Sequence, residues 1–199
     1  HDKTLQLIGR RHSVRDFYDA YELVRKSRIP VVNVDLIIGL PQETEQEIAY
    51  SLEQAVKLAP ENLTVHTLTL KRSAPLFQKQ EQAVLTTQAA EKMVQRAAEM
   101  AAAIGLEPYY LYRQHYMLGH LANIGYAKPG TESIYNIQMM EERHPVIGVG
   151  PASASKVPLP DGHHLHKLNM PKNVAVYGAR LQELAERRRD LFNIEGTDL

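Results

Sequence analysis

The chain has 199 residues, of which 44% are hydrophobic, and its 23 basic residues balance its 23 acidic ones. This composition fits one or one and a half domain cores and excludes a low-complexity protein. The balanced charge gives no general attraction to nucleic acid or to an acidic membrane surface. The sequence shows no apolar run of about 18 residues and no secretory signal, so no membrane span is predicted and the cytoplasm is the expected location.

The sequence contains no cysteine. It therefore offers no disulfide, no thiolate ligand for a metal and no cysteine nucleophile. The chain begins with HDKTLQ rather than with methionine, which indicates a piece of a longer protein. Any function inferred from it is expected to be incomplete.

The first half of the sequence alternates between helical and strand periodicity. Apolar residues at spacings of three and four predict a helix from Val14 to near Ser27. The β-branched run PVVNVDLII at residues 30–38 is apolar on both faces, which is typical of strands in parallel sheets. The helix that follows carries Thr44 and Glu47 at capping-box spacing.

Two further elements continue this alternation. Residues 62–70, NLTVHTLTL, predict a strand, and residues 86–105 predict a helix that ends at Gly105. This order of elements predicts an α/β fold with parallel strands and crossover helices. Residues 1–105 are therefore expected to form one domain.

The composition changes in the second half, and residues 106–199 are expected to form a smaller α+β region. Residues 133–157 predict one or two short strands. Asp161 and Gly162 predict the tip of a hairpin, because this dipeptide favours two-residue turns. A last helix is predicted over residues 173–192, with basic residues at its C-terminal end, as the helix dipole favours.

An acid, Asp35, stands inside the apolar strand at residues 30–38. An unpartnered buried carboxylate costs several kcal/mol, so this side chain is expected to bind something. Ligands of parallel sheets bind at the carboxyl ends of the strands, which here is the Gly39–Pro41 turn. Arg10 lies one β/α unit upstream. Together Arg10 and Asp35 suit a ligand that carries a carboxylate and vicinal hydroxyls.

Five motifs in this order and spacing carry a family resemblance: IGRRHS, NVDLIIGLPQET, YYLYRQ, NIGYAKPG and IGVGPASASK. With them the chain resembles the latter half of the oxygen-independent coproporphyrinogen III oxidase family of radical S-adenosylmethionine (SAM) enzymes, most of all its HemZ-type coproporphyrinogen dehydrogenases. The resemblance implies the later β/α units of a partial (β/α)6 barrel. It also implies an activity, in which a 5′-deoxyadenosyl radical made from SAM starts the oxidative decarboxylation of propionates to vinyls in haem biosynthesis.

The resemblance also implies roles for four residues. Arg10 would bind the methionyl carboxylate of SAM, and Asp35 would accept from its ribose. Thr69 falls where the family's next strand passes the adenine, and Ala154 falls on a late loop that touches SAM. The family has a small residue where Thr69 stands, so this contact would be made through the backbone.

One departure from the family is large. The CxxxCxxC motif that binds the [4Fe–4S] cluster and the glycine-rich SAM site lie on strands that this chain does not contain. The cluster is therefore expected in the full-length parent, ligated outside this chain, and the fragment alone is expected to be inactive. Its expected partners are the missing N-terminal half, an electron donor and the porphyrinogen substrate.

A propionate-bearing substrate needs cations at the barrel mouth. Lys71 and Arg72 follow the strand at residues 62–70, and Arg113 stands in YYLYRQ. These three are the candidate substrate-binding residues. The alternative is that they are solvated loop charges, and no catalytic residue can be assigned.

Structural interpretations stay open for the other candidates. Asp35 can cap a neighbouring loop, and Arg10 can be a solvated arginine. A histidine tract can ligate zinc, although solvated hairpin residues explain it as well; its members are His163, His164 and His166. Tyrosines can stack on a porphyrinogen or pack at a domain junction; they are Tyr109, Tyr110, Tyr112, Tyr116 and Tyr126.

Two alternatives to the oxidase remain. Relatives of the family act as haem chaperones, in which case His115 or His120 would serve as an axial ligand. The other alternative is an unrelated β/α barrel segment, which the absence of CxxxCxxC upstream in the parent gene would favour.

Overall fold

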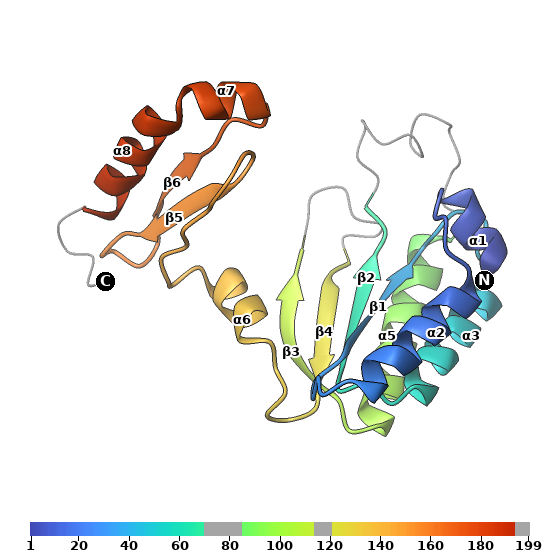
Figure 1. Ribbon diagram of the computed structural model, residues 1–199. Helices are drawn as coiled ribbons and strands as arrows, with labels where there is room; N and C mark the ends of the chain where they lie inside the picture. Colours follow the sequence, from blue (N-terminus) through green and yellow to red (C-terminus); the bar gives the residue numbers. More distant parts are fainter. Residues whose placement is uncertain (70–84, 114–120, 194–199) are drawn as a thin grey trace. The chain divides into compact units, whose positions relative to one another are not determined.

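The computed structural model describes residues 1–69, 85–113 and 121–193. It divides into two compact units, His1–Ser133 and Ile134–Leu199 (Figure 1). The predicted boundary near residue 106 falls inside the first unit. Residues 107–127 stay with that unit because they form two strands of its sheet.

The first unit is built on a four-stranded sheet in the order β1-β2-β4-β3. The strands are β1 (Asn33–Ile38), β2 (Asn62–Thr67), β3 (Glu107–Tyr112) and β4 (Asn123–Ala127). β1 and β2 are parallel, as predicted, and Asp35 pairs with Thr64. β4 runs antiparallel to both β2 and β3.

Within the described ranges, the helices that accompany this sheet are α1 (Asp2–Leu7), α2 (Val14–Lys26), α3 (Glu45–Lys57) and α5 (Thr87–Ala103). The predicted capping box at Thr44 and Glu47 begins α3. A second box, in which Ser13 is the N-cap, begins α2. Gly105 follows α5 with a φ of 76°, a left-handed value that glycine adopts without strain.

The core lies on one face of the sheet, where α3 and α5 pack against β1 and β2 (Figure 1). Val34 and Ile38 are buried there, whereas Asn33 and Asp35 on the other face of β1 are exposed. The prediction that this strand is covered on both faces is therefore wrong for this chain. The described helices cover one face, and the polar face is left for a site.

The second unit contains a hairpin and three helices: α6 (Ile134–Glu141), β5 (Ala154–Pro158), β6 (Leu165–Asn169), α7 (Val174–Ala179) and α8 (Leu181–Phe192). The hairpin is confirmed, with Asp161 and Gly162 in the loop between β5 and β6. Its loop is longer than the two residues of the signal, because Pro158 is paired with Leu165. Leu168 packs there with Met170 and Leu184 of α8.

The strand predicted within residues 133–157 is confirmed by β5, which begins at Ala154, and Val146 forms an isolated bridge with Lys156. The helix α6 in the same stretch was not predicted, although Ile134, Ile137 and Met140 follow each other at the helical spacing of three. The predicted C-terminal helix is two helices, since Arg180 takes a φ of −112° between α7 and α8. Within the described ranges, no helix has the length and apolar character that a membrane crossing requires.

Candidate functional site

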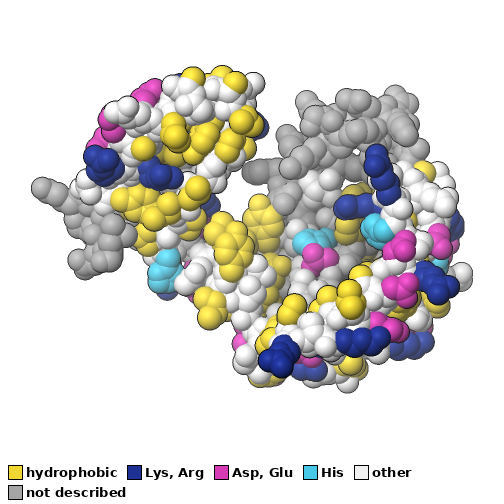
Figure 2. Space-filling view, viewed as in Figure 1, with side chains coloured by type: hydrophobic (Ala, Val, Ile, Leu, Met, Phe, Trp, Pro, Cys, Tyr) yellow, Lys and Arg dark blue, Asp and Glu magenta, His cyan; other side chains and the backbone are white. Residues whose placement is uncertain are grey.

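A pocket of about 700 Å³ opens on the first unit at the carboxyl ends of β1 and β2. Its walls come from α1 and the loop that follows it, from both strands, from the loop after β1 and from Asn123 of β4. Figure 2 shows histidine, acidic and basic side chains gathered around this hollow of the first unit. Arg10, Asp35 and Thr69, three of the four residues predicted to bind SAM, line it together.

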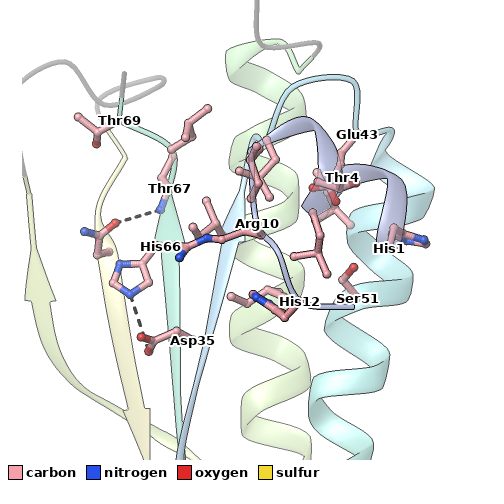
Figure 3. A pocket seen from close by; sticks show the side chains of 18 residues that line it. His1, Thr4, Arg10, His12, Asp35, Glu43, Ser51, His66, Thr67 and Thr69 are labelled. Atoms are coloured by element: carbon pink, nitrogen blue, oxygen red, sulfur yellow. Dashed lines mark hydrogen bonds and ion pairs between the residues drawn. The ribbon is translucent and has the colours of Figure 1, made fainter. Parts of the chain in front are cut away.

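Arg10 reaches the pocket because the chain turns sharply after α1. Gly9 has a φ of 73°, and the Arg10 N–H donates to the carbonyl of Leu5 at 2.8 Å. The side chain then extends toward β1 and β2 (Figure 3). Among the described residues, no carboxylate forms an ion pair with its guanidinium. The guanidinium lies in the pocket wall, where an anionic ligand can meet it.

Asp35 lies on the polar face of β1. Its Oδ1 accepts a hydrogen bond of 2.7 Å from Asn33 Nδ2. The same oxygen lies 3.8 Å from His66 Nε2 (Figure 3). The His66 imidazole is the largest cause of a lowered pKa for Asp35, the Asn33 amide adds to it, and burial opposes both. The side chain is 61% exposed. The predicted desolvation problem is therefore absent from this chain, and the carboxylate is ionised and open to a ligand.

The turn after β1 forms the rim of the pocket. Gly39 has a φ of 91° and Gln42 one of 61°, so the chain reverses in a few residues before α3 begins. Glu43 ends up only 5% exposed, and burial raises the pKa of its carboxyl while a hydrogen bond with Thr4 lowers it. The sequence reasoning missed Glu43, because an acid in a β/α turn is usually solvated.

On β2, the pocket extends to Thr67 and Thr69. The Thr67 N–H donates to Asn123 Oδ1 at 2.9 Å, which ties the end of β2 to β4. Thr69 is half-buried in the pocket wall. Ala154, the fourth predicted SAM residue, begins β5 in the second unit. There a Cβ on Gly148 would lie 2.4 Å from the Ala154 carbonyl oxygen, so this loop needs a glycine.

The substrate candidates are placed only in part. Arg113 is exposed immediately after β3, whereas Lys71 and Arg72 lie outside the described residues. His115, His120 and Tyr116 also lie outside them. The position of Arg113 neither assigns nor removes a role in binding propionates.

The hairpin histidines surround a turn. Asp161 Oδ1 accepts from the backbone N–H groups of His163 and His164, and Asp161 Oδ2 lies 2.7 Å from His164 Nδ1. These hydrogen bonds give the turn a structural explanation. In the part of the chain that the structure describes, no three metal-ligating side chains come together.

The tyrosines take different places. Tyr126 is 2% exposed and packs in the core, which gives it a structural role. Tyr109 and Tyr110 form an edge-on pair with ring centroids 4.9 Å apart. Tyr112 is exposed at the end of β3.

Other residues of the pocket were not predicted, above all His66, and also His12, Ser51 and Asn123. A signal for His66 existed in the alternation of the strand. Thr64 and His66 share a face of β2, and the parallel pairing of Thr64 with Asp35 sets that face beside the acid.

Comparison with known proteins identifies this architecture, although no family model matches the chain. It is 39% identical over 188 residues to the oxygen-independent coproporphyrinogen-III oxidase-like protein HemZ of Bacillus subtilis, covering 94% of this chain and 38% of HemZ. It is 26% identical over 164 residues to the haem chaperone HemW of Escherichia coli, covering 82% of this chain and 40% of HemW.

Among solved structures, coproporphyrinogen III oxidase (HemN) from Escherichia coli, described as a radical SAM enzyme, matches with a TM-score of 0.65 at 16% identity. The match covers 92% of this chain and 41% of that one. The fold is thus that of the later part of a radical SAM enzyme. The chain belongs to the oxygen-independent coproporphyrinogen oxidase family, where it corresponds to the C-terminal part. It spans about two fifths of the length of these relatives.

Proposed function

We propose that the parent protein is a radical SAM coproporphyrinogen dehydrogenase and that this chain supplies the part of its barrel that holds SAM. The parent would oxidatively decarboxylate coproporphyrinogen III to protoporphyrinogen IX. The similarity to HemZ over nearly the whole chain and the HemN-like fold support this proposal.

The observation that carries the proposal is the common pocket of Arg10, Asp35 and Thr69. SAM presents a carboxylate, a ribose with vicinal hydroxyls and an adenine. Arg10, which has no acidic partner among the described residues, fits the carboxylate, and the exposed, ionised Asp35 fits the ribose hydroxyls. The end of the parallel strand at Thr69 fits the adenine. The volume of about 700 Å³ also lies in the range of nucleotide-sized sites.

Arg10 would bind the methionyl carboxylate through its guanidinium fork, and Asp35 would accept from the ribose hydroxyls. Thr69 would contact the adenine through its backbone. Ala154 is proposed to contact SAM from the second unit, as the family pattern implies. These contacts bind and orient the cofactor, while the reacting centre lies beyond the residues assigned.

The [4Fe–4S] cluster needs cysteine thiolates, and the chain has none. Its ligands are therefore proposed to lie in the N-terminal half of the parent. When bound there, cluster and SAM supply the hydrogen-abstracting oxidant. An electron donor, not identified by this chain, would reduce the cluster.

Calorimetry of SAM binding to the full-length parent tests this proposal. Arg10→Ala and Asp35→Asn should each weaken binding by about 2 kcal/mol, the scale of a lost charge-assisted hydrogen bond. Arg15→Ala is the matched control, because Arg15 is exposed on α2, where it forms an exposed ion pair with Asp19 away from the pocket. Wild-type affinity in both pocket variants would remove the SAM assignment from this chain.

A haem chaperone is the second candidate function, because HemW of Escherichia coli is also similar to this chain. In that case the parent would bind haem and leave coproporphyrinogen unchanged. Titration with haem, followed by absorbance, distinguishes it: stoichiometric binding without decarboxylation would favour the chaperone.

A further inference from the structure

A hydrogen-bonded network of polar side chains lies on the polar face of the sheet, opposite the helices. The Thr64 hydroxyl on β2 donates to Asn33 Oδ1 on β1 at 3.0 Å. This bond fixes the Asn33 amide, because its oxygen is occupied and its nitrogen must then face the other way. The same nitrogen donates to Asp35 Oδ1 at 2.7 Å.

Tyr110 of β3 lies next to this network. Its ring lies over Gly125 of β4, where a Cβ would come within 1.9 Å of Tyr110 Cε1. Burial raises the pKa of the Tyr110 hydroxyl, and a side-chain hydrogen bond with Thr64 lowers it. Thr64 is itself 3% exposed, so this end of the network is shielded from water.

His66 completes the arrangement at the Asp35 end. Its Nε2 lies 3.8 Å from Asp35 Oδ1, which is an ion-pair distance rather than a hydrogen-bond length. The imidazole is half-buried in the pocket wall beside Thr67. The Asp35 carboxylate therefore faces the Asn33 amide and the His66 ring, and Thr64 also interacts with it.

An exposed carboxylate normally samples several rotamers, and a ligand must fix one of them at a cost in conformational entropy. Two neighbours that meet the same oxygen reduce this freedom before the ligand arrives. The buried end at Thr64 also makes the arrangement rigid, because Thr64 cannot exchange its partners for water.

We propose that His66 and Asn33 are positioning residues, which hold the Asp35 carboxylate in one orientation on the polar face of the sheet for the vicinal hydroxyls of a bound nucleoside. This inference rests on the proposed SAM site and deepens it. The two residues act through Asp35 and need not contact the ligand themselves.

A double-mutant cycle in the full-length parent tests the role of His66, with SAM affinity from calorimetry as the readout. His66→Phe keeps a planar aromatic ring, slightly larger than imidazole, and removes the nitrogens; it should weaken SAM binding about fivefold. In an Asp35→Asn background the same change should have an effect of less than about twofold, because the group that it positions has lost its charge. His163→Phe, an exposed hairpin position, is the matched control.

A conservative variant separates positioning from simple packing. His66→Gln restores an N–H donor near the position of Nε2 and should recover most of the affinity. The positioning role would be overturned if His66→Phe and His66→Gln lost the same SAM affinity. It would also be overturned if His66→Phe weakened SAM binding equally in the wild-type and Asp35→Asn backgrounds. If His66→Phe does not fold, Asn33→Ala replaces it in the same cycle with the same expectations.

The outcomes also separate this inference from the proposal beneath it. Loss of affinity in Asp35→Asn together with wild-type affinity in His66→Phe would overturn the inference and leave the SAM site standing. Wild-type affinity in Asp35→Asn, Arg10→Ala and His66→Phe alike would overturn the SAM site, and with it the inference.

Discussion

Tyr110 and Gly125 are paired across β3 and β4, and the tyrosine ring occupies the space where a side chain on residue 125 would stand. The NIGYAKPG motif therefore needs its glycine for a steric reason. Because residue 125 has no side chain, the Tyr110 ring can lie over β4. The glycine thus allows the tyrosine to pack on this face of the sheet.

Gly125→Ala should displace Tyr110 and destabilise the protein by about 1–3 kcal/mol, the usual cost of overpacking. Gly178→Ala in α7 is the matched control, since a Cβ there meets no atom within 4 Å and alanine favours the helix. Thermal unfolding of both variants checks the prediction. Equal melting temperatures for Gly125→Ala and wild type would contradict the steric account.

Arg25 joins α2 to the loop before β2. Its Nη1 lies 2.7 Å from Glu61 Oε2, and the same oxygen accepts from the Val32 N–H at 3.1 Å. The two side chains are only 30% and 17% exposed. Arg25→Ala should therefore lower the free energy of unfolding by about 1–3 kcal/mol, because it leaves a half-buried carboxylate with fewer partners.

The control for Arg25 is Arg15→Ala, which removes an exposed pair at 3.7 Å with Asp19. Exposed pairs contribute about 0–1 kcal/mol. Denaturant unfolding should thus rank Arg25→Ala well below Arg15→Ala in stability. The reverse order would show that the contacts of Arg25 do not hold α2 in place.

Glu47 predicts a pH dependence at the start of α3. An ion pair with Lys3 and the backbone N–H of Thr44 lower the pKa of its carboxyl to about 2. Because the pKa of Glu47 is lower in the folded state than its value of about 4.3 in the unfolded state, the ionised carboxylate stabilises the fold at pH values above about 4.3. This stabilisation is lost as the pH falls toward the folded-state pKa of about 2. Glu47→Gln should flatten the stability curve in that window. An unchanged slope between wild type and variant would contradict the assignment.

Much of the first unit could be predicted because its signals are local. The capping box at Thr44, the parallel pair of strands and the glycine after α5 follow from residue type and spacing. The helix at residues 134–141 was missed because its apolar residues stay exposed, so no clear buried face marks it.

Part of the pocket could be predicted from strand ends and residue type, which pointed to Arg10 and Asp35, and the family pattern added Thr69. Arg10, Asp35 and Thr69 fall in one pocket, as their motifs imply. The alternation of β2 puts His66 on the same face as Thr64, but the register of β2 against β1 is needed to bring that face beside Asp35. Glu43 was missed because its burial depends on the path of a turn.

Arg113 provides a test of the substrate proposal. If it binds a propionate of coproporphyrinogen, Arg113→Ala in the full-length parent should raise KM about tenfold while kcat changes little, which is the signature of uniform binding. Lys71→Ala and Arg72→Ala extend the series to the other two candidates. SAM affinity, measured separately, should stay at the wild-type value, and an unchanged KM in all three variants would place the propionate contacts elsewhere.

The most direct test of the central claim is product analysis of the full-length parent with coproporphyrinogen III, SAM and a reductant. We expect decarboxylated porphyrinogen and consumption of SAM by the wild type. At a SAM concentration near the wild-type Kd, both should fall strongly in Asp35→Asn, because its SAM binding is weaker by about 2 kcal/mol, while its thermal unfolding stays at the wild-type temperature. The decarboxylase proposal would be contradicted if the intact, cluster-loaded wild-type protein left the substrate unchanged and bound haem stoichiometrically instead.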